Sequence, residues 1–428
     1  KFHGVPSQSS ALGVSEAGLI DGFAVIKTPL RAATKEHSDV LYNTLVADMA
    51  NQRGQYAVAV RHYTSAARLS NDPGLAELAT MAALAATDDQ AVATNLSFWL
   101  LLEPDSQSAV QLAALIAAET GNIDVSLTHI KHLIDLCNAA GIDGYQETVQ
   151  LLERLEDVQL RLQLGQRLLA TIPDVPKAML AVAMVDIGAN DFAKAEGLIQ
   201  KALAKNPDWE EAQLLLVQVT RTLHGAKNAQ TTVETFLASR PQSIELRSVY
   251  AKLLLGQNDF SAAKQQFEIL HKAEPKNGDI LFALGVLSLQ LQQRTAAIKY
   301  LQDLYNSGAH ADDAAFYLGQ IFEDEHNLEQ ALAWYARVKS GNQLDAQVRV
   351  ARIYARQGSM ARAREILQQV RGQLNSLGVI QVDLTEAEML RELKLYSVAM
   401  EVLTNAVTRN PNNHDLLSAK LKLSNHIQ

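Results

Sequence analysis

The sequence is poor in several residue types that other kinds of protein need. Its single cysteine, Cys137, excludes an internal disulfide and a cysteine-rich zinc site. Only 10 of the 428 residues are proline and 22 are glycine, which argues against long disordered linkers. Aromatic residues make up 6%, while alanine and leucine are plentiful, as helix-on-helix packing prefers. A run of about 18 apolar residues, which a transmembrane helix needs, does not occur.

Positive charge and catalytic motifs are also lacking. The formal net charge of −9 disfavours general binding to nucleic acid or to anionic membranes. The chain has no phosphate-cradling GxxxxGK[ST], no GxSxG, no HExxH and no paired CxxC. Apolar residues nevertheless make up 48%, enough for a continuous core. These observations predict a protein that is not an enzyme and that needs no cofactor.

What the sequence does contain is a repeat of 34 residues between Pro176 and His310. Each copy carries a small or medium apolar residue in a helical pattern, then an alanine, then a bulky residue, and three of the loops close on a proline. The corresponding positions are Ala183, Val217, Ala251 and Gly285; Ala195, Ala229, Ala263 and Ala297; Ile199, Val233, Phe267 and Leu301; and Pro207, Pro241 and Pro275.

This order of small, small, bulky and proline has a physical reason. Two antiparallel helices approach closely only where small residues face each other, and a bulky residue fills the space beside that contact. Proline ends the second helix because it lacks an N–H and disfavours helix in the residue before it. The pattern resembles the tetratricopeptide repeat, a helix–turn–helix unit. It predicts an all-α fold, a right-handed α-solenoid of about eleven tetratricopeptide helix pairs.

Landmarks along the chain predict three regions. Residues 1–38 do not fit the repeat and are interpreted as an N-terminal arm or tether, the alternative being foreign or loosely assigned sequence. Residues 39–172 form an N-terminal block of repeats ending in a degenerate unit, 141–172, whose helices are expected at Gln146–Glu156 and Val158–Ala170. Residues 173–428 form the regular block, and its last unit is truncated. Because an array that stops on half a unit needs a cap or a continuation, the full-length protein is expected to continue.

One group of residues has the spacing of metal ligands. His129 and His132 lie three residues apart on one predicted helical face, with Asp135 and Cys137 near, and could bind a transition metal. The ordinary alternative, the polar surface of a second helix, is the one we favour. We therefore predict no metal site.

The resemblance to tetratricopeptide repeats implies a binding groove. In that family the first helices of the units line the concave face, and the second, fifth, ninth, twelfth and thirteenth residues of each unit point into it. An apolar floor beside an acidic patch and then a basic stripe would suit a protein segment with apolar and charged groups. The predicted groove contacts are Phe282, Phe316, Gln320, Arg349, Arg352 and Arg356.

The three arginines have a second interpretation. Their spacing of three and four residues places them in one stripe on one helix. Arg352 and Arg356 could also pair with Glu323 and Asp324 across neighbouring helices. Both interpretations stay open at this point.

Two segments resemble a more specific family. The first is DVLYNTLVADMANQRGQYAVAVRHYTSAARLSNDPGLAELATMAALAATDDQAV, and the second is HADDAAFYLGQIFEDEHNLEQALAWYARVKSGNQLDAQVRVARIYARQG. They resemble proteobacterial tetratricopeptide lipoproteins, and the resemblance covers roughly residues 39–417. It implies a protein anchored to the outer membrane from the periplasm, an adaptor that binds a carboxyl-terminal processing serine protease and helps it to cleave cell-wall hydrolases. Two features depart from that family: no lipid-bearing cysteine lies near Lys1, and the repeats expected after residue 417 are missing.

A more general function needs only the repeat itself. A tetratricopeptide scaffold could serve in secretion, pilus or envelope-polymer assembly. An upstream signal peptide ending in a lipid-attachment cysteine would favour the lipoprotein adaptor, and its absence would favour the general scaffold. Self-association through the end helices is a further expectation for a long solenoid of this kind.

Overall fold

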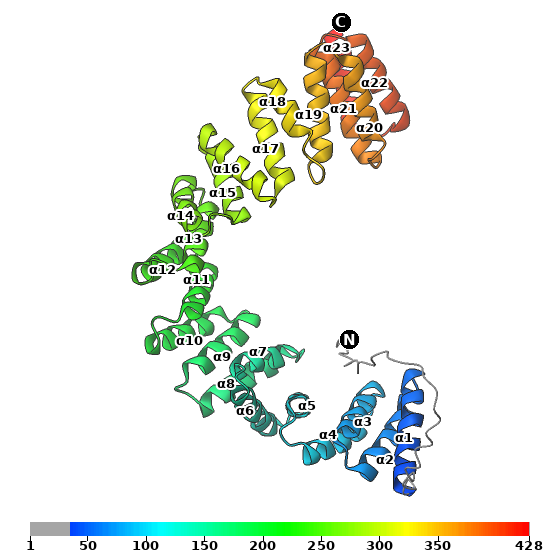
Figure 1. Cartoon of the computed structure of the whole chain (residues 1–428), viewed down its shortest axis with the longest axis vertical. Helices are drawn as coiled ribbons and strands as arrows, with labels where there is room; N and C mark the ends of the chain where they lie inside the picture. Colours follow the sequence, from blue (N-terminus) through cyan, green and yellow to red (C-terminus); the bar gives the residue numbers. More distant parts are fainter. Residues whose placement is uncertain (1–34, 428) are drawn as a thin grey trace, which may run out of the picture. The chain divides into compact units, whose positions relative to one another are not determined.

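In a computed structural model the described part of the chain, residues 35–427, is built from helices alone. It contains 23 α-helices and, within that range, no strand (Figure 1). The helix number is that expected for eleven helix pairs and a half, so the predicted all-α solenoid is confirmed. None of the described helices combines the length and the apolar character that a membrane span requires.

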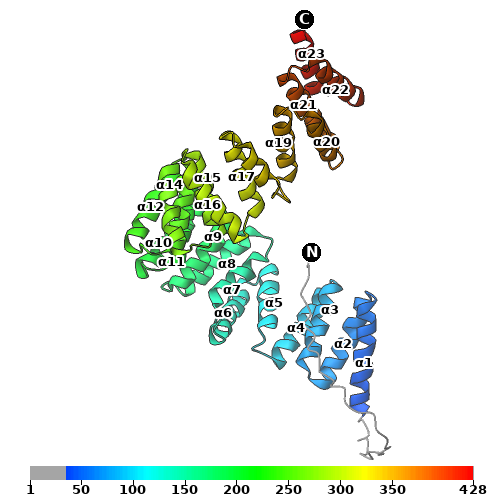
Figure 2. The same ribbon diagram turned by 45° about the horizontal axis from the view of Figure 1, so that its top comes forward.

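The helices belong to two compact units, Lys1–Leu155 and Glu156–Gln428. Within the first unit, α1 to α4 lie side by side in chain order (Figures 1 and 2). The helices of this unit are α1 (Lys35–Gln52), α2 (Tyr56–Ser70), α3 (Pro73–Ala85), α4 (Asp89–Leu102), α5 (Gln107–Glu119), α6 (Ile123–Ala139) and α7 (Gly144–Glu153).

The second unit contains the 34-residue repeats. Its helices are α8 (Val158–Thr171), α9 (Pro176–Gly188), α10 (Phe192–Lys205), α11 (Glu210–His224), α12 (Ala226–Ser239), α13 (Ile244–Gly256), α14 (Phe260–Ala273), α15 (Gly278–Gln290), α16 (Arg294–Ser307), α17 (Ala311–Asp324), α18 (Leu328–Tyr335), α19 (Gln343–Arg356), α20 (Met360–Arg371), α21 (Ser376–Glu392), α22 (Tyr396–Arg409) and α23 (His414–Ile427).

The predicted boundaries and the observed units differ in detail. The division between the units falls after Leu155, inside the predicted degenerate unit 141–172 and between its two helices. The predicted boundary at residue 172 stays a prediction. Of the predicted arm, 1–38, the last four residues belong to α1, where lysine and glutamate are good helix formers, and residues 1–34 lie outside the described residues.

Small residues allow the two helices of a repeat to meet, as the pattern predicts. A Cβ atom added to Gly285 on α15 would lie 2.7 Å from Leu301 on α16. On α17, a Cβ added to Gly319 would lie 2.5 Å from the ring of Tyr335 on α18. Real Cβ atoms essentially never come so close, so the bulky residue of the second helix occupies the space that the small residue leaves.

Capping side chains mark several of the helix starts, whereas others, such as those of α2, α5 and α11, have no side-chain cap. A carboxylate, amide or hydroxyl oxygen just before the helix accepts a hydrogen bond from a backbone N–H that has no partner within the helix. Asp143, for example, accepts from the amides of Tyr145 and Gln146 at the start of α7. The residues that cap in this way are Asp72, Asp88, Asp143, Asp157, Asp191, Ser243, Asp259, Asn277, Asn327 and Asn375.

Two buried carboxylates on α21 pair with partly exposed arginines of α20 and α22. Asp383 and Glu386 on α21 are 1% and 2% exposed. Arg371 donates to both carboxylates, with a distance of 2.8 Å to Asp383 Oδ1. Glu386 also accepts from Arg364 at 2.7 Å, and Asp383 accepts from Arg409 at 2.8 Å. A buried carboxylate is tolerated when it is paired and hydrogen-bonded in this way. These pairs therefore fix the three helices relative to one another.

Asp186 on α9 is a buried charge without such compensation. Its side chain is 2% exposed, and its Oδ1 has no hydrogen-bond partner. Burial raises its pKa from 3.8 to about 6, and the nearby Asp191 carboxylate adds to this rise. The positive charge of Lys194 lowers the pKa and offsets only part of the rise. Asp186 is therefore a source of instability at neutral pH.

Candidate protein-binding groove

The six residues predicted as groove contacts come from three consecutive first helices. Phe282 lies on α15, Phe316 and Gln320 on α17, and Arg349, Arg352 and Arg356 on α19. Phe282, Gln320, Arg349 and Arg352 are half-buried, Phe316 is buried and Arg356 is exposed. The six residues therefore do not offer one uniformly open surface, and their role in binding stays a prediction.

The two phenylalanines belong to an aromatic cluster. The ring of Phe282 stacks on His310 at 5.4 Å between centroids and contacts Tyr317 at 5.9 Å. Phe316 lies against Tyr317 and Tyr335, at 6.2 and 6.0 Å between centroids. These contacts fill the space between α15, α17 and α18, so Phe316 contributes to packing with only 9% of its surface exposed.

Arg349 completes this cluster on its polar side. Its guanidinium lies over the Phe316 ring at 5.8 Å and donates to Glu323 Oε2 at 3.0 Å. The Tyr335 hydroxyl donates to the same carboxylate oxygen at 2.6 Å. Burial and the neighbouring Glu323 raise the pKa of Tyr335, which keeps the phenol protonated as the donor.

The ion pairs of the basic stripe differ from the alternative that the sequence left open. Glu323 pairs with Arg349, while Arg356 lies 3.7 Å from Glu392 on α21. Arg352 forms no ion pair within residues 35–427. The alternative pairing of Arg352 and Arg356 with Glu323 and Asp324 is therefore not formed: Arg349, one turn before Arg352 on α19, pairs with Glu323, and Asp324 has no ion pair within residues 35–427.

The histidines suggested as metal ligands do not form a cluster. His132 pairs with Asp105 at 3.1 Å, and Cys137 is buried. Burial and the neighbouring His132 lower the pKa of His129. Throughout the described part of the chain, no three histidine, cysteine or acidic side chains lie close enough to hold a metal ion.

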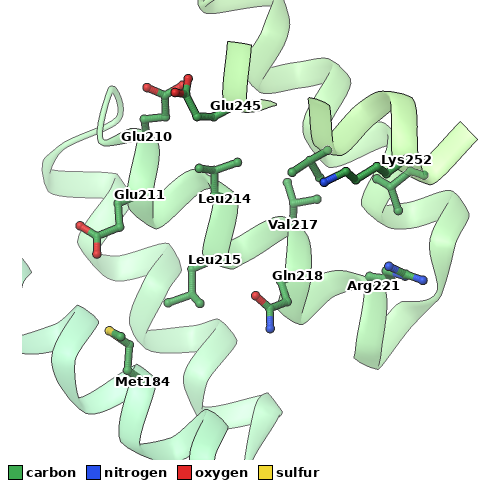
Figure 3. Close-up of a pocket in the computed structure, with 12 residues that line it drawn as sticks. Met184, Glu210, Glu211, Leu214, Leu215, Val217, Gln218, Arg221, Glu245 and Lys252 are labelled. Carbon is green, nitrogen blue, oxygen red and sulfur yellow. The ribbon is translucent and has the colours of Figure 1, made fainter. Parts of the chain in front are cut away.

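A further hollow lies earlier in the second unit, on the first helices α9, α11 and α13. It is a cleft of about 790 Å³ (Figure 3). Its floor is apolar, and its rim is charged. The lining residues are Met184, Glu210, Glu211, Leu214, Leu215, Val217, Gln218, Arg221, Glu245, Val249, Lys252 and Leu253.

Charges of opposite sign stand at opposite ends of this cleft. Glu210, Glu211 and Glu245 gather at one end and Arg221 and Lys252 at the other, with Leu214, Leu215 and Val217 between them (Figure 3). Glutamate in the first turn of α11 and arginine in its last turn also complement the helix dipole. The arrangement can accept a segment that is apolar in its middle.

The sequence alone did not single out this cleft. Its lining includes four positions of the 34-residue units. These are the second position (Glu211 and Glu245), the fifth (Leu214), the ninth (Gln218 and Lys252) and the twelfth (Arg221). The signal that could have identified the cleft is charge order. Two successive units carry a glutamate at the second position and a cation at the ninth or twelfth position.

Comparisons with known proteins agree with the repeat geometry. A family model described as tetratricopeptide repeat matches residues 251–313 and 289–346. This is a tetratricopeptide repeat protein. Such arrays stack their helix pairs into extended surfaces that bind protein partners.

A curated relative extends the similarity over most of the chain. The TPR repeat-containing protein PA4667 of Pseudomonas aeruginosa is 28% identical over 397 residues, which are 90% of this chain and 65% of the relative. The match therefore spans less than two thirds of the relative's length.

Solved tetratricopeptide structures are similar over shorter regions. One from Parabacteroides merdae is 15% identical and covers 58% of this chain and 98% of its own, with a TM-score of 0.39. The C-terminal part of a TPR repeat-containing protein from Cytophaga hutchinsonii is 17% identical and covers 55% of this chain and 97% of its own, with a TM-score of 0.44.

Proposed function

We propose that this tetratricopeptide protein is a non-catalytic scaffold that holds a segment of a partner protein in the cleft of α9, α11 and α13. The observation that carries the proposal is the cleft itself: about 790 Å³ of space over an apolar floor with charged ends. Apolar surface of this kind gives affinity when a partner covers it, and charged ends determine which partner fits.

We further propose that the partner is a carboxyl-terminal processing serine protease, and that the scaffold presents cell-wall hydrolases to it on the periplasmic side of the outer membrane. The support for this finer proposal is the resemblance of the first repeat and of residues 310–358 to proteobacterial tetratricopeptide lipoproteins. A lipid anchor in the full-length protein is part of the same proposal.

The test is co-purification of partner proteins with this protein from the native envelope. The unaltered protein is compared with a variant whose cleft is blocked. Gln218→Trp introduces a large side chain at an exposed position of the cleft lining. Gln200→Trp makes the same exchange at an exposed position of α10 outside the lining and is the matched control. We expect the protein and Gln200→Trp to recover a processing protease and to raise its rate of hydrolase cleavage, and Gln218→Trp to lose both effects.

Two results would count against the proposal. Recovery of no processing protease, or an unchanged rate of cleavage when the scaffold is added, would exclude the adaptor function. Recovery of a secretion, pilus or polymer-assembly component in its place would favour the general scaffold. Equal recovery by both tryptophan variants would move the binding surface away from the cleft.

A further inference from the structure

The charges at the ends of the cleft are not used by the fold. Glu211 and Glu245 at one end, and Arg221 and Lys252 at the other, are exposed and form no ion pair within residues 35–427. Glu210 differs, because it accepts from Arg240 at 3.3 Å and from the Ser243 hydroxyl. Four side chains of the cleft are therefore available to a ligand.

Helix stabilisation accounts for only some of these charges. Glu211, Glu245 and Arg221 lie in the end turns of their helices, where they complement the dipoles. Lys252 lies before the last turn of α13, which has no basic residue. The carboxylates of Glu211 and Glu245 lie at one end of the cleft without an ion pair. A bound positive charge would be attracted to both.

We propose that the cleft is selective for a bipolar peptide segment: a basic side chain beside Glu211 and Glu245, apolar side chains over Leu214 and Leu215, and an acidic group beside Arg221 and Lys252. This inference rests on the proposed protein-binding function and adds the chemistry of the bound segment. Charge complementarity at both ends selects against segments with the same charge at both ends, because one end would then face its own sign.

The length of the segment follows from helix geometry. Glu211 and Arg221 are ten residues apart on α11, a distance of about 15 Å at the helical rise of 1.5 Å per residue. The same distance corresponds to about five residues of an extended chain or about ten residues of a helix. A twelve-residue peptide can therefore span the cleft in either conformation.

The probe is a phage-displayed library of random twelve-residue peptides, selected against the full chain and against the variant Arg221→Glu with Lys252→Glu. Both replaced residues are exposed, so folding is preserved and is checked by circular dichroism. We expect the unaltered protein to enrich peptides with a basic and an acidic end around an apolar middle. The variant, whose cleft is acidic at both ends, should enrich peptides that are basic at both ends.

Affinities of the selected peptides give the second measurement. Because each reversed charge replaces an attraction by a repulsion of similar size, the bipolar peptide should bind the variant about tenfold more weakly at low salt. The difference should shrink as ionic strength rises. Gln218→Trp should abolish binding of the bipolar peptide, and Gln200→Trp should leave it unchanged.

The outcomes separate this inference from the proposed function. Enrichment of the same charge pattern by both proteins, or equal affinity of the bipolar peptide for both, would overturn the bipolar selectivity while leaving the cleft as a binding site. Enrichment of peptides whose binding is insensitive to Gln218→Trp, or of no peptides, would overturn the cleft as a binding site and the bipolar selectivity with it.

Discussion

Replacing Asp186 by asparagine should make the second unit more stable at neutral pH and remove a pH dependence. The carboxylate is buried, and its pKa is raised from 3.8 to about 6. Between these two pH values the native state binds more protons than the unfolded state, so stability falls as pH rises from about 4 to about 6. Above that range the native state carries the full cost of the ionised group.

The magnitude follows from the shift. A pKa that is raised by about two units lowers the free energy of unfolding by about 3 kcal/mol at pH 8, and about half of that loss is present at pH 5. Asparagine has the same shape as aspartate but does not ionise, so residue 186 no longer contributes to the pH dependence of stability in Asp186→Asn. The difference in free energy of unfolding between Asp186→Asn and the unaltered protein should therefore be larger at pH 8 than at pH 5 by about 1.5 kcal/mol.

The fluorescence of Trp209 provides the assay, because this side chain packs against the core formed by α9, α10 and α11. Urea unfolding is followed at pH 5, 6, 7 and 8 in a protein whose other two tryptophans, Trp99 and Trp334, are replaced by phenylalanine. Asp208→Asn, an exposed aspartate on the loop before α11, is the matched control. Parallel pH profiles for Asp186→Asn and the unaltered protein would refute the reasoning.

Three further predictions concern the second unit. Gly319→Ala should destabilise the protein by about 1–3 kcal/mol, since the added methyl carbon would lie 2.5 Å from an aromatic ring; thermal unfolding measures the loss. Glu386→Gln should cost about 1–3 kcal/mol in urea unfolding because it weakens the hydrogen bonds between a buried carboxylate and two partly exposed arginines. Glu401→Gln at an exposed position should cost almost nothing. Charge reversal at Arg352 and Arg356 should weaken binding of the co-purified partner without unfolding the array.

Controls for the first and third of these lie in the same unit. Gly188→Ala, where an added Cβ meets nothing within 4 Å, should leave the melting temperature unchanged or raise it. Lys272→Glu with Lys276→Glu reverses two exposed charges elsewhere and should not affect partner binding. Unchanged binding after reversal of Arg352 and Arg356 would make the stripe structural. An unchanged melting temperature for Gly319→Ala would show that α17 and α18 can separate at no cost.

The fold could be predicted from the sequence because a single contact recurs. The pair formed by Gly285 and Leu301 is repeated as Gly319 and Tyr335, and each pair is visible in the sequence as a small residue followed sixteen positions later by a bulky one. Since this contact joins helices that are adjacent in the chain, a local pattern was sufficient to specify it. The same reasoning applies to the helix starts, where a capping residue stands next to the amides that it binds.

The charged features could not be predicted in the same way. Arg364 reaches Glu386 across 22 residues and from the preceding repeat, and no local pattern distinguishes that arginine from one on the surface. The cleft is lined by residues of three helices, α9, α11 and α13, and its acidic end combines glutamates of α11 and α13. Such a combination is not visible in any single stretch of sequence. The three arginines lie on one helix, α19, as the sequence predicts, but only the reach of each side chain decides that Arg349 is the one that contacts Glu323.

The contacts between helices have a mechanical consequence. Within each unit the main helix contacts join neighbours, or next neighbours, along the chain. A pulling force applied to the ends of such a unit passes through these interfaces mainly in series. The weakest interface should therefore yield first and alone, so that force spectroscopy should record a series of small extensions in place of one large rupture.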